Sequence, residues 1–118
     1  MKSYIKEVLM NATGFDAYEM EAPDNANYPY IVFEPRRISV VDYIENFVLE
    51  INVWDKNKTY NRVDGITDKI EKALDHEHNL NKKKLGVFYK GNRQPVLDED
   101  KQIKRVREQF DMIVIERR

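Results

Sequence analysis

Two short clusters in this 118-residue chain contain residue types that could support chemistry. His76, Glu77 and His78 form the only histidine cluster of the sequence. A zinc site on a helix uses ligands at positions i and i+4, with further ligands supplied from elsewhere. Histidines two residues apart point to different sides of a helix, and the chain has no third histidine and no cysteine. We therefore interpret this triplet as a polar helix end and predict no metal site.

The second cluster, Asp98, Glu99 and Lys101, resembles the acid-x-Lys pattern with which nucleases hold Mg²⁺ and polarise water. That chemistry needs the triplet on a strand beside another acidic residue. Here it follows Pro95 in a predicted turn, where Asp and Glu are common for conformational reasons. The sequence also lacks a glycine-rich nucleophile elbow and a phosphate-binding loop. We predict that the protein is not an enzyme and needs no cofactor, and we keep a Mg²⁺-dependent nuclease as the less favoured alternative.

Composition narrows the range of partners. Twenty basic and 21 acidic residues give a net charge of −1, so the chain has no overall field that would attract nucleic acid or an anionic membrane. No segment approaches the roughly 20 apolar residues of a membrane span. The length predicts one domain over residues 1–118, and the absence of cysteine excludes disulfides.

The spacing of apolar residues predicts an α+β domain. Helical periodicity runs from Ser3 to Gly14 and again from Thr59 to His76, and period-two or β-rich segments occupy 28–35, 44–55, 85–96 and 103–116. The polar segments 16–27 and 76–84 are predicted to be connectors. We expect a two-layer sandwich in the order α-β-β-α-β-β, with an approximately four-stranded, mostly antiparallel sheet and two helices packed on one face. Its predicted core contains Leu49, Ile51, Ile66, Ile70, Phe110 and Met112.

The two predicted strands with the clearest alternation, 44–55 and 103–116, carry apolar side chains on both faces. Val48 and Trp54 alternate with the predicted core side chains of one strand, and Ile113 and Ile115 do so on the other. Burying one such side chain contributes roughly 1.5–3 kcal/mol, so this second apolar face favours a covering partner. Either another molecule covers the face, or the segments 16–27 and 36–46 fold over it within one monomer. Segment 36–46 fits a strand extension or a long loop, and we favour a protruding β-arm that joins the first strand to the second.

Three stretches together resemble the tail-terminator, or tail-completion, proteins of long-tailed, siphovirus-type bacteriophages and prophages. These stretches are YPYIVFEP, the strand FVLEINVWDKN running into the helix TYNRVDGITDKIEKAL, and the closing strand REQFDMIVIER. The family pattern is an N-terminal helix, a strand opening on a Tyr-Pro pair, a strand that runs into a helix, and two long C-terminal strands. The resemblance spans nearly the whole chain and carries no catalytic residues.

The resemblance implies a structural virion protein that acts at the neck end of the tail after assembly in the bacterial cytoplasm. Its relatives cap the last ring of the tail tube as a homohexameric ring, stop tube polymerisation and present the surface that joins the head. The implied partners are other copies of the chain, the tail-tube protein and a head–tail connector protein, while DNA passes through the ring without specific binding. Another connector or stopper protein of the phage neck is the alternative. The candidate subunit interface contains Ile38, Val40, Val41, Tyr43, Trp54, Ile113 and Ile115.

Overall fold

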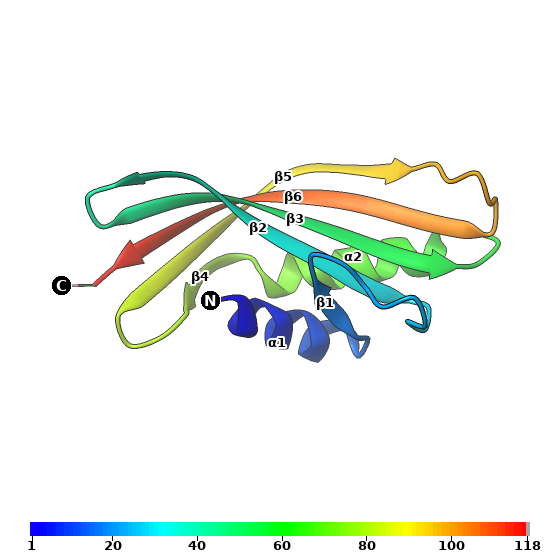
Figure 1. Cartoon of the computed structure of the whole chain (residues 1–118), viewed down its shortest axis with the longest axis horizontal. Coiled ribbons are helices and arrows are strands. Elements are labelled where there is room, and N and C mark those ends of the chain that lie inside the picture. The colour runs from blue at the N-terminus through cyan, green and yellow to red at the C-terminus, as the bar shows by residue number, and fades with distance from the viewer. Residues whose placement is uncertain (118) are drawn as a thin grey trace.

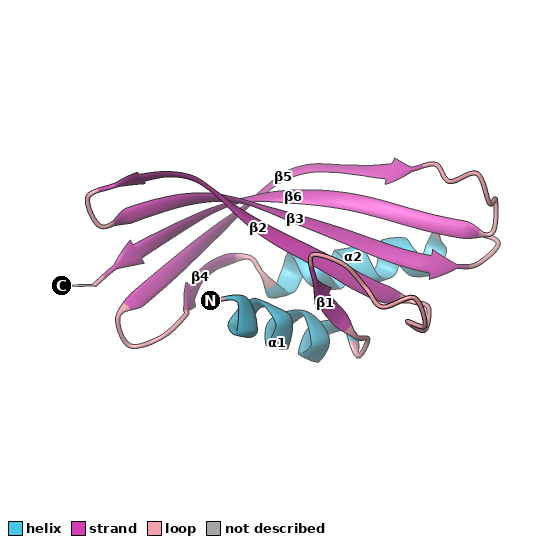
Figure 2. Cartoon of the chain, in the orientation of Figure 1, coloured by secondary structure: helices cyan, strands magenta, loops and turns pink. Residues whose placement is uncertain are grey.

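The computed structural model describes residues 1–117 and consists mainly of one curled sheet with two helices (Figures 1 and 2). The elements are α1 (Lys2–Thr13), β1 (Ala17–Glu19), β2 (Tyr30–Val41), β3 (Ile44–Lys56), α2 (Asn61–Ala73), β4 (His76–Asn79), β5 (Lys84–Val96) and β6 (Ile103–Glu116). No helix of the described part of the chain is long and apolar enough to cross a membrane.

The sheet is six-stranded and mixed, in the order β1-β2-β3-β6-β5-β4. β1 pairs with β2 in parallel, and all other neighbours are antiparallel. The prediction of a four-stranded, mostly antiparallel two-layer sandwich is therefore wrong. The structure adds a short strand at each edge of the sheet, in the segments that we predicted to be connectors.

The two missed strands are held by backbone pairing more than by apolar side chains. β1 has three residues, and β4 has the sequence HEHN, so neither shows the apolar alternation that identifies a half-buried strand. The predicted polar helix end at His76–His78 is likewise wrong, because α2 ends at Ala73 and these residues pair with β5. Periodicity detects strands that bury side chains and gives little signal for short polar edge strands.

The core lies between the helices and one face of the sheet. Figure 1 shows α1 and α2 on the same side of the sheet. α1 ends at Gly14, whose positive φ of 77° suits a helix C-cap, and its buried face includes Ile5 and Leu9. All six residues predicted for the core belong to the buried cluster, together with side chains from every long strand.

An ion pair between a buried carboxylate and a half-exposed guanidinium stabilises the short connection between β3 and α2. Asp55 near the end of β3 is fully buried, and Arg62 in the first turn of α2 donates to both of its carboxylate oxygens. The donor–acceptor distances are 2.8 Å for Nε and 2.6 Å for Nη2. This two-point contact fixes the start of α2 against the sheet.

The sheet is long and strongly curled, and the molecule measures 50 × 25 × 23 Å. Register irregularities interrupt the pairing between Arg37 and Ser39 in β2 and between Lys90 and Arg93 in β5. Such irregularities increase the natural right-handed twist of a sheet. The second of them lies around Gly91, and β5 continues through it as one strand.

Candidate subunit interface

The segment 36–46, called the arm below, is the hairpin formed by the end of β2 and the start of β3. Asp42 makes the turn with a φ of 52°, a left-handed conformation that Asp tolerates well. The hairpin projects beyond the helices at one end of the molecule (Figure 1). Four of its apolar side chains remain exposed: Ile38 at 65%, Val40 at 50%, Val41 at 61% and Tyr43 at 41%. Within the monomer the arm therefore does not cover the second face of the sheet.

Backbone pairing and polar contacts order the arm. Val41 lies opposite Ile44 in the antiparallel ladder, and the backbone N–H of Glu116 donates to the carbonyl of Tyr43 at 3.0 Å. The amide of Asn46 donates to the Ser39 hydroxyl at 3.1 Å. Because the sheet holds the backbone, the exposed apolar side chains are presented in a defined arrangement.

The structure brings two more predicted interface residues next to the arm. Ile115 lies opposite Ile44, and Ile113 lies opposite Asn46. Both isoleucines are half-buried. We call the arm and this end of β6 the arm patch, whose apolar residues are Ile38, Val40, Val41, Tyr43, Ile113 and Ile115. Val41 shares the outer face of the sheet with Ile115, whereas Val40 lies opposite Glu45 and faces the other side.

Trp54, the remaining predicted interface residue, lies at the far end of β3 and is not part of the arm patch. Its ring stacks on Tyr30 with a centroid distance of 6.2 Å and an interplanar angle of 17°. The guanidinium of Arg105 lies 4.5 Å from the centre of the Trp54 ring and also donates to Asn52. Burial lowers the pKa of Arg105 in this position. Sequence reasoning missed Tyr30 and Arg105 because their contacts depend on the register between three strands.

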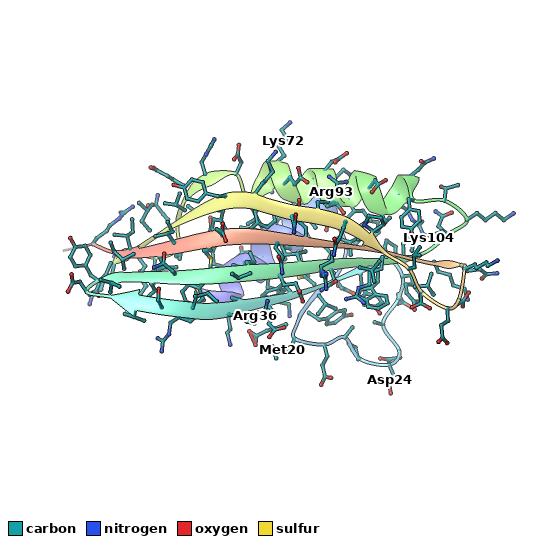
Figure 3. All side chains as sticks on the ribbon, turned by 90° about the horizontal axis from the view of Figure 1, so that it is seen from above. Met20, Asp24, Arg36, Lys72, Arg93 and Lys104 are labelled. Atoms are coloured by element: carbon teal, nitrogen blue, oxygen red, sulfur yellow. The ribbon has the colours of Figure 1, made fainter. Side chains whose placement is uncertain are left out.

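A charged cluster between α2, β5 and β6 was also missed. Arg93 of β5 points toward α2 (Figure 3), where it donates to Asp68 at 2.7 Å and to Glu71 at 2.8 Å. Glu108 of β6 is 2% exposed, and burial raises its pKa well above the ordinary range. A hydrogen bond donated by protonated Glu108 lowers the pKa of Glu71. Alternation along β6 could have identified Glu108, because it shares its face with the core residues Phe110 and Met112.

An open pocket of about 510 Å³ adjoins this cluster, between the start of α2 and the end of β5. Its charged groups are Asp64 and Arg93, which form an ion pair at 3.5 Å. The rest of its lining is mainly Tyr60, Pro95, Leu97 and Val106. The wall of the pocket is therefore mainly apolar, and its two charged groups form an ion pair with each other.

The clusters first considered for chemistry have local structural roles. Asp98 accepts from the backbone of Asp100, and Asp100 accepts from that of Gln102, both at 2.9 Å, within the β5–β6 turn. His78 lies 2.7 Å from the Tyr4 hydroxyl, and burial lowers the pKa of its ring. No group of three potential metal ligands is present among residues 1–117.

Comparisons with known proteins find similarity in structure but none in sequence. No protein-family model and no curated protein sequence matches the chain. Among solved structures, it is similar to a chain from the virion of a native gene transfer agent particle. The TM-score is 0.75 at 15% sequence identity, and the match covers 92% of this chain and 84% of that chain. At this identity the similarity shows a shared fold.

Proposed function

We propose that this protein is a structural component of a phage-like particle and that it caps the tail tube as a ring of six copies. The ring stops tube polymerisation and provides the surface to which the head is joined, at the neck end of the tail. The arm patch is the observation that carries this proposal, because an ordered and exposed apolar surface favours contact with another protein. The similarity in fold to a chain of a virion supports a structural role in a phage-like particle.

The arm patch suits a self-limiting assembly. It lies at one end and one edge of an elongated molecule, so each copy can offer it to a different surface of the next copy. Such head-to-tail contacts close into a ring when the rotation between neighbours completes a circle. Tyr43 is the aromatic anchor of the contact, of the type that dominates binding energy at interfaces.

The charge balance suits a ring through which DNA passes. A net charge of −1 gives no strong overall attraction to phosphate, so the duplex can move through without being held. Trp54, which has partners within its own chain, is proposed to contact the tail-tube or connector protein and not the neighbouring copy.

Tail length tests the proposed function and separates it from a connector role. Deleting the gene from the genome that encodes this chain should give overlong, uncapped tails in electron micrographs. Loss of a connector protein would instead give tails of normal length that fail to join heads. Tails of normal length in the deletion strain would overturn the capping function.

Complementation then tests the arm. We expect the Ile38→Ser, Val41→Ser double variant to keep a melting temperature within a few degrees of that of the unmodified protein, because both side chains are mostly exposed. It should fail to restore normal tail length. Leu97→Ser is the matched control, since Leu97 is 88% exposed but lies in the β5–β6 turn away from the arm, and this variant should restore capping. Full capping by the double variant would show that the arm is not the contact.

A further inference from the structure

The outer face of the sheet, which points away from α1 and α2, carries two neighbouring rows of side chains at the arm end (Figure 1). The first row crosses four strands and contains Val41, Ile44, Ile115 and Leu85. The second row contains Ser39, Asn46, Ile113 and Val87. Ser39 and Asn46 are hydrogen-bonded to each other, and the other six side chains are apolar. Among the described residues, neither row contains a charged side chain.

These apolar side chains extend the exposed surface of the arm across the sheet to β5. Val41 is exposed and the other five are half-buried. Three of them, Ile44, Leu85 and Val87, are not among the residues that the sequence predicted for the interface. We call this area the outer patch; it contains Val41, Ile44, Leu85, Val87, Ile113 and Ile115.

A row with two charged side chains bounds the outer patch toward the middle of the sheet. This row contains Arg36, Val48, Asp111 and Tyr89. The stacked pair Tyr30 and Trp54 lies farther along the same face, beyond this polar row. An apolar centre with a polar rim is the usual anatomy of a protein interface. The outer patch and the surface around Trp54 are therefore two separate areas.

The outer patch is small. The four strands from β2 to β5 span about 19 Å, and two rows extend about 13 Å along the strands, which gives an area of about 250 Å². A stable interface of standard size buries about 800 Å² per partner. A molecule that covers the outer patch must therefore also be held by other contacts.

We infer that the neighbouring copy of this chain covers the outer patch, and that it therefore lies against the helix-free face of the sheet and away from α1 and α2. This inference rests on the proposed ring and specifies which face of the arm makes its contact. Continuity assigns the partner, because Val41, Ile113 and Ile115 belong to both the arm patch and the outer patch. An area of this size has no room for two different partners. Because neither row is charged, covering it desolvates no ion.

A photo-reactive side chain can identify the molecule that lies on the outer patch. We place p-benzoylphenylalanine in the position of Val87, which is in β5 and outside the arm. The modified protein is expressed together with the unmodified protein in the deletion strain, so that mixed rings form on the tails. Irradiation of purified capped tails should link two copies of this chain, and mass spectrometry identifies the product. The same probe in the position of Lys72, an exposed residue of α2, is the control and should link no second copy.

A charge placed in the outer patch gives a second test. Val87→Asp should abolish capping of tails, because the carboxylate would have to be buried without a partner. Lys72→Asp changes the charge of the exposed helix surface and should leave capping intact. Circular dichroism of both variants checks that the fold is kept. Full capping by a folded Val87→Asp variant would overturn the inference.

The linked products separate this inference from the capping function. A product that contains the tail-tube or connector protein in place of a second copy would overturn the inference. So would the absence of a product from position 87, or an equal yield of linked copies from position 72. In each of these cases the capping function stands if the tails have normal length. Tails of normal length in the deletion strain itself would overturn the capping function.

Discussion

Glu108 shows how one side chain can set the pH response of the molecule. Its carboxyl group lies among core side chains of β6, and one of its oxygens has no hydrogen-bond partner among the described residues. The groups that face it are Glu71 on α2 and Arg93 and Lys90 on β5. Burial, followed by the adjacent Glu71, raises the pKa of Glu108 to about 9. The folded protein therefore holds a proton here that the unfolded chain has lost at neutral pH.

This proton gives stability a predictable dependence on pH. Between the unfolded pKa of about 4.3 and the raised folded value, the folded state binds more protons, so stability falls as pH rises. Glu108→Gln keeps the shape and removes the titration. We expect its melting temperature to exceed that of the unmodified protein by more at pH 8.5 than at pH 7. Glu34→Gln, on the opposite face of the sheet, is the control, and an identical pH dependence in all three proteins would contradict this assignment.

At the scale of the elements, the sequence predicts the helices and strands that bury apolar side chains. It misses the short strands that are held mainly by backbone pairing. The long strands and both helices have apolar periodicity, and their core residues Leu49 and Phe110 lie where alternation predicts. β1 and β4 do not have it, and the prediction of an approximately four-stranded, mostly antiparallel sheet was therefore wrong. The same limit applies to the interface: alternation identifies Ile113 and Ile115 as facing away from the core, but the register that separates Trp54 from the arm patch is a tertiary property.

The packing of α2 gives a prediction about stability. Ile70 is fully buried between the sheet and α1, so Ile70→Ala should lower the free energy of unfolding by about 2–5 kcal/mol. Lys72→Ala changes an exposed residue in the same turn and should alter it by no more than about 0.5 kcal/mol. Denaturant titration of the three proteins measures both effects. Equal midpoints for all three would be inconsistent with the placement of this helix face.

At the scale of the whole molecule, the core and the exposed arm patch are separate parts of the fold. The protein has a core of its own between sheet and helices, so subunit contact is not needed to bury Ile5, Leu49 or Ile70. What the monomer leaves exposed is the arm patch. We therefore expect the free subunit to stay folded, and in the proposed assembly it would join other copies only at high local concentration.

The order of the ring tests the proposed assembly at this scale. Cryo-electron microscopy of capped tails measures the number of copies around the tube axis. Six copies are expected, whereas a ring of another order at this position would contradict the proposed capping by six copies.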